Sequence, residues 1–420
     1  MTSGALWIPL LWIMIIGSRP ISLWFGGEIQ METQDDYLEG SPLDRNVFLI
    51  LIITGLMVLF RRRVDWSKLF ASNRWFFAFL LYCGISVMWS YYPFVSFKRW
   101  TKELGNVIMI LIILTEKDNV QAFKAVFSRY TYFAIPLSVL FIKYIPAMGR
   151  YYNRWTWEPG YSGISTNKNE LGCVLFVCGL WLVWDLVEMR KSSSGQIDKL
   201  DLCARILLLL MVFWLISIAN SSTALVCFII GTCILLFMQR PSVRRHIKYL
   251  GTYSLSLGFL LLILYTVPGV LEALVGLVGR DMTFTGRTDL WTDLLTEPIN
   301  PLIGTGYESF WLGPGAQRMW EKYYFHPVQA HNGYLQTYLN DGLVGVGLLI
   351  AMIVSAGTKL KKDLLAGSSF GILRFSFLVL VLFCNWTEAM FSGISLVWII
   401  MLIAALNYPT LPRSCMETAK

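Results

Sequence analysis

His331 and Arg287 are the two side chains whose types best suit catalysis. His331 lies in AHNGYLQTYLNDGLVG, which spans residues 330–345, and Arg287 lies in TGRTDLW. A neutral imidazole can take a proton from a hydroxyl group. A guanidinium stays charged and binds phosphate oxygens through two parallel hydrogen bonds. Together the two residue types suit a site that activates a hydroxyl and stabilises a phosphate leaving group.

Each residue also has a purely structural interpretation. His331 could cap a helix or form a hydrogen bond at a membrane interface, and Arg287 could pair with Asp289 or Asp293. The segment 268–332 contains four basic and seven acidic residues, so it is not a bulk basic surface. We therefore expect an arginine in this segment to be held in a specific ion pair or site.

Further candidates lie in loops that we expect on the same face of the molecule. Lys168 and Asn169 stand just before a predicted helix, where backbone amides favour a bound anion. Ordinary capping by asparagine is the alternative there. Asn332 directly follows the candidate base and could also contact a substrate. The remaining candidates for substrate binding are Lys98, Arg99, Arg150, Arg154 and Arg280.

No residue pattern predicts a metal site. His326 lies five residues before His331, whereas two histidines that bind zinc from one helix face are four residues apart. The eight cysteines form no CxxC pair and lie mostly in apolar runs, so we interpret them as packing residues. Arg129 lies inside an apolar run, where it could either snorkel or pair.

The composition identifies the elements that must position these residues. The 420-residue chain is 55% hydrophobic and only 15% charged, which is more apolar than a soluble domain. Its apolar runs are continuous, as membrane helices require, and do not alternate as barrel strands do. We therefore predict an all-α polytopic membrane protein. The net charge of +8 is explained by basic loops that orient the helices, not by nucleic-acid binding.

About twelve membrane helices are expected, forming one bundle over residues 1–420. The apolar start is interpreted as a retained first helix, because no basic residue precedes it and no small-residue cleavage site follows. The predicted spans are Gly4–Leu23, Leu43–Phe60, Asn73–Ser90, Leu104–Leu114 (extending back toward Lys98), Lys124–Ile145, Leu171–Val187, Cys203–Ala219, Thr223–Met238, Tyr249–Val267, Gly333–Ser355, Ser369–Asn385 and Gly393–Leu406.

Basic residues in alternate loops predict the orientation of the bundle. The positive-inside rule makes those loops cytoplasmic, and an even number of helices then places both termini in the cytoplasm. The long loop 268–332, between the ninth and tenth spans, falls on the opposite face. It is too short to stand alone, so we expect it to pack on the bundle. Within it, Asp289–Leu295 is predicted to form a short amphipathic helix, with one face made by Leu290, Trp291, Leu294 and Leu295.

An ordered set of motifs resembles the O-antigen ligase and Wzy-type polysaccharide polymerase superfamily, and the layout of about twelve spans is similar. The resemblance covers nearly the whole chain. The motifs are GSRP at Gly17–Pro20, GYSGISTNKNELG at Gly160–Gly172, SIANSSTAL at Ser217–Leu225, TGRTDLW at Thr285–Trp291, GTGYESFW at Gly304–Trp311, AHNGYLQTYLNDGLVG at Ala330–Gly345 and NWTEAMF at Asn385–Phe391.

The resemblance implies a membrane glycosyltransferase in the bacterial inner membrane. Such an enzyme moves a glycan from undecaprenyl diphosphate to an acceptor hydroxyl at the periplasmic face, inverts the anomeric centre and uses no metal or other cofactor. His331 matches the family's histidine and Arg287 its arginine. The implied partners are the lipid-linked glycan, the bilayer and other polysaccharide-assembly proteins. Basic residues that face the lipid diphosphate in the family are matched by Lys168, Arg150, Arg154, Lys98 and Arg99.

One segment departs from the family pattern. Ligases that act on the lipopolysaccharide core commonly place an arginine where this chain reads ANSSTALV, with Ser221 and Ser222. The form found here resembles the exopolysaccharide polymerase branch instead. We therefore expect polymerisation of exopolysaccharide or O-antigen repeat units. Joining of a finished glycan to lipid A-core or another acceptor is the alternative within the superfamily.

Two other protein classes fit the sequence less well. A transporter or flippase for a lipid-linked glycan favours internal repeats and charges at the membrane midplane. This sequence has no detectable repeat, and its polar residues gather at one face. A scaffold without activity has no need of both Arg287 and His331. Formation of a new glycosidic bond distinguishes the enzyme from the transporter.

Overall fold

The computed structural model describes residues 2–26, 41–152, 157, 159–191, 198–253, 256 and 287–408. The α-helices are α1 Trp7–Ile16, α2 Ile21–Trp24, α4 Pro42–Arg61, α5 Trp66–Ser72, α6 Arg74–Ser86, α7 Pro93–Leu114, α8 Asn119–Tyr144, α9 Pro146–Gly149, α10 Lys168–Lys191, α11 Lys199–Ala219, α12 Ser222–Phe237, α13 Pro241–Arg244, α16 Arg287–Leu295, α17 Pro314–Lys322, α18 Gly333–Leu365, α19 Ser369–Cys384 and α20 Leu396–Ala405. The short strands β1 Arg150–Tyr152 and β2 Pro159–Tyr161 pair in antiparallel fashion.

Most of the described chain is helical, which confirms the all-α prediction. Five helices are long and apolar enough to cross a membrane: α4, α8, α10, α11 and α18. Shorter apolar helices accompany them, including α12, α19 and α20. The protein is therefore a multi-pass membrane protein, while the count of about twelve spans stays a prediction. The predicted ninth span, Tyr249–Val267, lies mostly outside the described residues.

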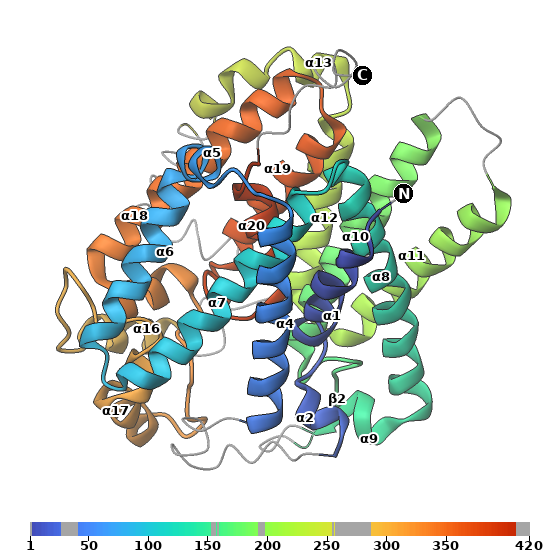
Figure 1. Ribbon diagram of the computed structural model, residues 1–420. Helices are drawn as coiled ribbons and strands as arrows, with labels where there is room; N and C mark the ends of the chain where they lie inside the picture. The colour runs from blue at the N-terminus through green and yellow to red at the C-terminus, as the bar shows by residue number, and fades with distance from the viewer. Residues whose placement is uncertain are drawn as a thin grey trace.

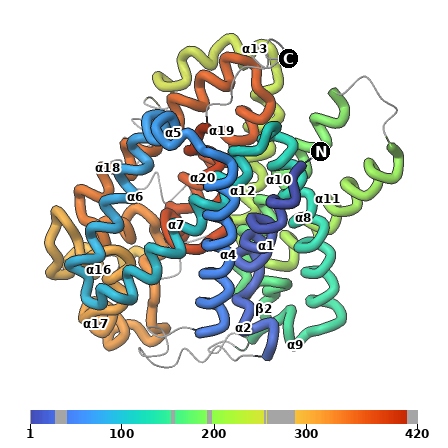
Figure 2. Tube along the Cα trace, viewed as in Figure 1, coloured from blue at the N-terminus to red at the C-terminus, as the bar shows by residue number. Residues whose placement is uncertain are grey.

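Helix α10 lies in the middle of the bundle and positions its neighbours. It packs against α11 and α12 and also contacts α20. Its middle section, from Leu171 to Leu182, is buried throughout. Helix α18 packs against α6 and α19, and α4 packs against α7. Figures 1 and 2 show α2, α9, α16 and α17 gathered at one end of the bundle, with α5 and α13 at the other.

The first predicted span is not a continuous helix. Helix α1 ends at Ile16, and α2 begins only at Ile21, after Pro20. Proline has no backbone N–H and its ring clashes with the preceding turn of a helix, so it favours a break or a kink, and here the helix breaks. The predicted span Gly4–Leu23 is therefore not one continuous helix, and Arg19 lies in the connection between α1 and α2.

Helix α18 is also interrupted, although the sequence predicted one span over Gly333–Ser355. Gly342 has φ 63° and ψ −166°, which splits the helix into two sections. The turn 300–306 inserts beside the break: Thr305 N donates to Leu339 O at 3.1 Å, and Leu343 N donates to Pro301 O at 2.9 Å. Glycine is required here, because a Cβ atom at Gly342 would lie 2.3 Å from the backbone of Leu302.

Residues 287–330 form a small layer over the first section of α18. Its own apolar cluster includes Leu290, Leu294, Trp311 and Met319, together with Leu339 of α18. This confirms the short amphipathic helix, although Leu295 is 62% exposed rather than part of the buried face. Four charged residues hold the outside of the layer together in two ion pairs. These pairs are Arg318 with Glu297 and Lys322 with Asp293.

Candidate active site

The carboxylate of Glu388 is the centre of a polar cluster at the end of the bundle where α16 lies. Its Oε2 lies 3.4 Å from Nδ1 of His331. Its Oε1 lies 3.4 Å from Nη2 of Arg287 and accepts a 3.1 Å hydrogen bond from Nδ2 of Asn169. Glu388 is only 4% exposed. Three residues predicted from the sequence therefore meet at one carboxylate that the sequence reasoning did not single out.

A turn between α19 and α20 carries Glu388 and is held at several points. Its backbone N–H donates to Cys384 O at 2.9 Å, which continues the last turn of α19. The side-chain oxygen of Asn385 accepts from Met390 N at 2.8 Å. The hydroxyl groups of Thr387 and Thr223 lie 3.2 Å apart, which joins the turn to the start of α12. The position of the carboxylate is therefore fixed by α10, α12, α16 and α18 together.

The backbone around His331 is held in an uncommon conformation. His331 has φ 49°, a left-handed value that costs energy for any residue with a Cβ atom. On one side, Ala330 O accepts a 2.8 Å hydrogen bond from Trp291 Nε1. On the other, the Asn332 side chain caps α18 by accepting from the N–H groups of Tyr334 and Leu335. This conformation aims the imidazole at Glu388.

The imidazole of His331 can act as a base in this arrangement. When Nδ1 carries the proton and donates it toward Glu388, Nε2 keeps a free lone pair. Within the described part of the chain, Nε2 makes no hydrogen bond, and the side chain is 26% exposed. A carboxylate that orients a histidine and stabilises its protonated form is the arrangement used in hydrolase triads. The pair can therefore accept a proton from an incoming hydroxyl.

Arg287 is the first residue of α16 and turns toward Glu388. Its Nη1 donates to the carbonyl oxygen of Thr387, and its Nη2 faces Glu388. Its ion pair is with Glu388, whereas Asp293, one of the two partners in the structural alternative, pairs with Lys322. The Arg287 side chain is 20% exposed, so an anion from solvent can reach it. Its planar fork suits phosphate oxygens.

The candidates Lys168 and Asn169, at the start of α10, have different surroundings. Asn169 belongs to the cluster through Glu388. Lys168 is exposed and, among the residues that the structure describes, its side chain makes no hydrogen bond or ion pair. Asn167 caps the start of α10 by accepting from the N–H groups of Asn169 and Glu170. Asn332 is likewise a helix cap, so its observed role is to position its neighbour His331.

The structure gives the other basic candidates different partners. Arg150 donates to Ile142 O at 2.9 Å, and Lys98 lies over the ring of Phe94. Arg99 donates to the backbone oxygen of Glu308 at 3.0 Å. None of these contacts reaches Glu388 in the described part of the chain. Arg154 and Arg280 lie outside the described residues.

Two positions that the sequence analysis left open also have observed contacts. Arg129, at the surface of α8, stacks over the ring of Trp7 at 4.7 Å. His326 stacks on Trp320, with ring centroids 5.8 Å apart. Neither contact connects the residue with the polar cluster around Glu388. Their aromatic partners explain both side chains as packing groups.

Glu388 and Arg19 are the functional or positioning residues that the sequence reasoning missed. A charged residue between two apolar spans is a recognised signal for a functional group, and Glu388 has that setting within NWTEAMF. Arg19, in GSRP, donates to the backbone oxygens of Met148, Gly163 and Ser165, each at 2.8–3.0 Å. Arg19 thereby secures the loop that leads into α10, and through it the position of Asn169.

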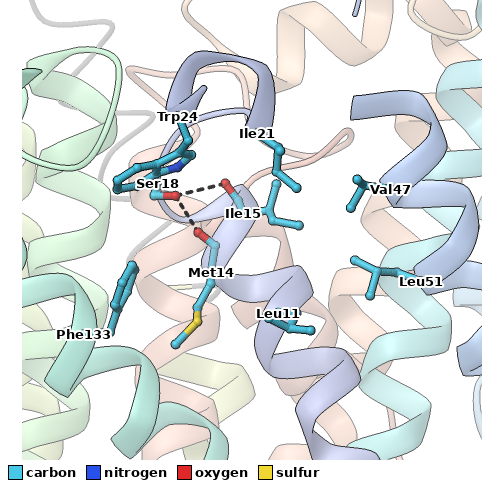
Figure 3. Close-up of a pocket in the computed structure, with 9 residues that line it drawn as sticks. All are labelled: Leu11, Met14, Ile15, Ser18, Ile21, Trp24, Val47, Leu51 and Phe133. Carbon is cyan, nitrogen blue, oxygen red and sulfur yellow. Dashed lines mark hydrogen bonds between the residues drawn. The ribbon is translucent and has the colours of Figure 1, made fainter. Parts of the chain in front are cut away.

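Two cavities elsewhere in the molecule carry no comparable chemistry. The first, of about 320 Å³, lies between α1, α2, α4 and α8 and is shown in Figure 3. Its lining is apolar except for Ser18, whose hydroxyl donates to the backbone oxygen of Met14. The second, of about 640 Å³, includes Arg374 and Lys359, whose N–H groups cap the last carbonyl groups of α20. The first cavity has no titratable group in its lining, and in the second the carboxylate of Asp363 is paired with Arg374 at 2.9 Å.

Comparisons with known proteins agree with this chemistry. Residues 206–350, which include Arg287 and His331, match the family model described as O-Antigen ligase, the Wzy_C family. The exopolysaccharide production protein ExoQ of Rhizobium meliloti (strain 1021) is 26% identical over 322 residues, which cover 72% of this chain and 69% of that protein. The chain is therefore similar to the O-antigen ligase family over residues 206–350 and to an exopolysaccharide production protein over most of its length, which supports a membrane protein with a polysaccharide polymerase or ligase role.

Proposed function

We propose that the protein polymerises exopolysaccharide or O-antigen repeat units at the periplasmic face of the bacterial inner membrane. The donor is a glycan linked to undecaprenyl diphosphate, and the acceptor is a hydroxyl group of another glycan. The observation that carries the proposal is the meeting of His331, Arg287 and Asn169 at the carboxylate of Glu388. A candidate base and a candidate anion-binding group lie side by side there.

The proposed reaction is a single displacement at the anomeric carbon. Nε2 of His331 takes the proton from the acceptor hydroxyl, and the acceptor oxygen forms the new glycosidic bond. At the same time, the bond between the anomeric carbon and the diphosphate oxygen breaks, and the diphosphate leaves. One displacement inverts the configuration of that carbon. His331 then carries the proton, and Glu388 stabilises the positive charge of its ring.

Arg287 is the proposed binding group for the leaving diphosphate. A diphosphate gains negative charge on the departing oxygen as the bond breaks, and a guanidinium aimed at that oxygen lowers the barrier. The fork of Arg287 can bind two phosphate oxygens at once, which a lysine cannot do. Its hydrogen bond to the backbone of Thr387 keeps the fork in place while it does so. This chemistry needs no metal, because a fixed cation supplies the charge.

A ligase that makes one transfer to a different acceptor is the second candidate. The description of the matched family model, O-Antigen ligase, favours it, and the same residues would perform the same displacement. The two candidates differ in whether the product becomes an acceptor again. The site performs the same chemistry in both candidates, so the distribution of product lengths distinguishes the polymerase from the ligase.

Purified protein incubated with lipid-linked repeat units, without any nucleotide sugar, tests the proposal. A ladder of lipid-linked products with increasing length supports a polymerase. A single added glycan on a second acceptor supports a ligase instead. Movement of the lipid-linked substrate across vesicles without a new glycosidic bond would contradict both and would favour the transporter. The His331→Ala protein, checked for normal thermal unfolding, is the negative control, because it lacks the proposed base.

A further inference from the structure

We infer that Glu388 is a shared counter-ion that holds Arg287 until the diphosphate binds and then serves His331. The inference rests on the proposed function, because it assigns the order of events within that site. It concerns a positioning residue: Glu388 touches the two groups that would contact the substrates and acts through them. Its two carboxylate oxygens are shared between these groups.

The two oxygens of Glu388 face different partners. Oε1 serves Arg287 and Asn169, and Oε2 serves His331. The charged contacts are both 3.4 Å, whereas the neutral bond from Asn169 is 3.1 Å. Within the described residues, Arg287 is the only permanent cation within 4 Å of the carboxylate. The charge of this buried carboxylate is therefore balanced mainly by a long contact that can be exchanged.

Arg287 is attached so that it can change partner without leaving the site. Its Nη1 bonds to the carbonyl oxygen of Thr387, the residue just before Glu388. That bond involves the backbone and does not depend on the carboxylate. A diphosphate carries more negative charge than a carboxylate and can accept two parallel bonds from the fork, so it competes well for the remaining N–H groups. Asn169 stays on Oε1 and keeps Glu388 in position.

The exchange has a consequence for His331. Once Arg287 pairs with phosphate, the carboxylate of Glu388 has no cation as its partner. An imidazole at Oε2 that can gain a proton then becomes its best available counter-ion. Binding of the leaving group would thus make His331 a more effective base at the moment when a base is needed.

The inference predicts opposite effects on binding and turnover for Glu388→Gln. The amide keeps the shape of the side chain but removes its charge, so Arg287 no longer has a competing carboxylate. Affinity for inorganic diphosphate should rise by roughly fivefold, the size of one lost ion pair. The kcat for glycan transfer should fall by about 10²-fold or more, because His331 loses its charged partner. A residue with only a structural role would weaken both properties together.

The experiment measures binding of inorganic diphosphate to the purified full-length protein in nanodiscs, alongside kcat and KM for transfer. Glu297→Gln is the matched control, because it removes the carboxylate of another Glu–Arg pair, with Arg318, far from the chemistry. The Glu297→Gln variant should change neither the affinity for diphosphate nor the rate of transfer. The double variant Arg287→Ala with Glu388→Gln should lose the gain in affinity, since the gain depends on the guanidinium.

Unchanged or weaker diphosphate binding in a folded Glu388→Gln protein would overturn the inference. Asn169→Ala is the second variant if Glu388→Gln does not fold. The Asn169→Ala variant leaves Arg287 as the sole observed donor to Oε1 of Glu388. The affinity for diphosphate should therefore fall severalfold. An increase in that affinity would contradict the inference. The binding assay needs no glycan transfer. If affinity responds as expected but no protein forms a glycosidic bond, the proposed function fails while the exchange between Glu388 and diphosphate remains supported.

Discussion

The backbone N–H of Gly333 donates a 2.8 Å hydrogen bond to the carbonyl oxygen of Asn385. This bond joins the start of α18, two residues after His331, to the turn that carries Glu388 three residues after Asn385. A Cβ atom at Gly333 would lie 2.1 Å from the side-chain oxygen of Asn385. The close approach of these two segments sets the distance between the imidazole and the carboxylate.

Replacing Gly333 with alanine should therefore damage the site more than the fold. The added methyl group must push the turn at Asn385 away, which lengthens the contact between His331 and Glu388. We expect at least a tenfold loss of transfer rate, because small misplacements of catalytic groups are costly. Initial rates with purified protein would check this. Gly357→Ala is the control, since no atom lies within 4 Å of a Cβ atom built there; equal losses in both variants would contradict the account.

Arg287→Lys should impair function although it keeps the positive charge. A lysine has no planar fork, so it cannot bond to Thr387 O and bind two phosphate oxygens at once. We expect weaker binding of diphosphate and a transfer rate lower by about 10²-fold, as for loss of one oxyanion-stabilising group. Arg318→Lys, in the exposed pair with Glu297, should retain both properties. Full activity of Arg287→Lys would show that only the charge matters.

Gly342→Ala should destabilise the protein by about 2 kcal/mol or more. A residue with a Cβ atom is strained at φ 63°, and the new atom would meet the backbone of Leu302. Thermal unfolding of detergent-purified protein measures the effect. Gly347→Ala, in the same helix with open space around it, should be neutral or slightly stabilising. Equal stability of Gly342→Ala and wild type would contradict the observed break in α18.

The layer formed by residues 287–330 should weaken in acid. Hydrogen bonds from Lys322 and then Tyr323 lower the pKa of Asp293 below its usual value. A carboxyl group with a lowered pKa stabilises the fold above its unfolded pKa of about 3.9, and this stabilisation is lost as pH falls through the lower folded value. Asp293→Asn should therefore unfold at a lower temperature than wild type near pH 6. The difference should shrink as the pH falls below the unfolded pKa of about 3.9 and disappear once the pH is below the folded pKa of Asp293.

A matched variant separates this effect from general acid damage. Asp289 is exposed on the same helix, and Asp289→Asn should not reproduce the loss seen for Asp293→Asn at pH 6. Thermal unfolding at several pH values, followed by tryptophan fluorescence, provides the comparison. A difference between wild type and Asp293→Asn that does not shrink as the pH is lowered through the acid range would mean that the ion pair is not its cause.

Hydropathy was sufficient to predict the main helices, and for a physical reason. Lipid requires every backbone polar group of a span to be bonded within its own segment, so long apolar runs become helices such as α4, α8 and α10. The same signal could not reveal the break at Gly342. That break depends on the turn 300–306, which lies far away in the sequence and supplies the replacement hydrogen bonds.

The candidate site was predictable only in part. Residue chemistry and a family resemblance pointed to Arg287 and His331, and the structure places both at one carboxylate. Glu388 itself was not identified, because its proximity to the pair arises from the packing of α10, α16, α18 and the turn after α19. Asn332 caps α18, and its predicted contact with substrate stays a prediction. Pairwise contacts between distant segments are not encoded in local spacing.

The most direct test of the central claim compares chain extension by purified wild-type and His331→Ala proteins on the same lipid-linked repeat units. His326→Ala is the matched control, because His326 is in the same loop region but stacks on Trp320 away from Glu388. The account predicts product ladders for wild type and His326→Ala, and no extension, or a rate lower by about 10²-fold or more, for His331→Ala. A full ladder from folded His331→Ala protein would contradict it.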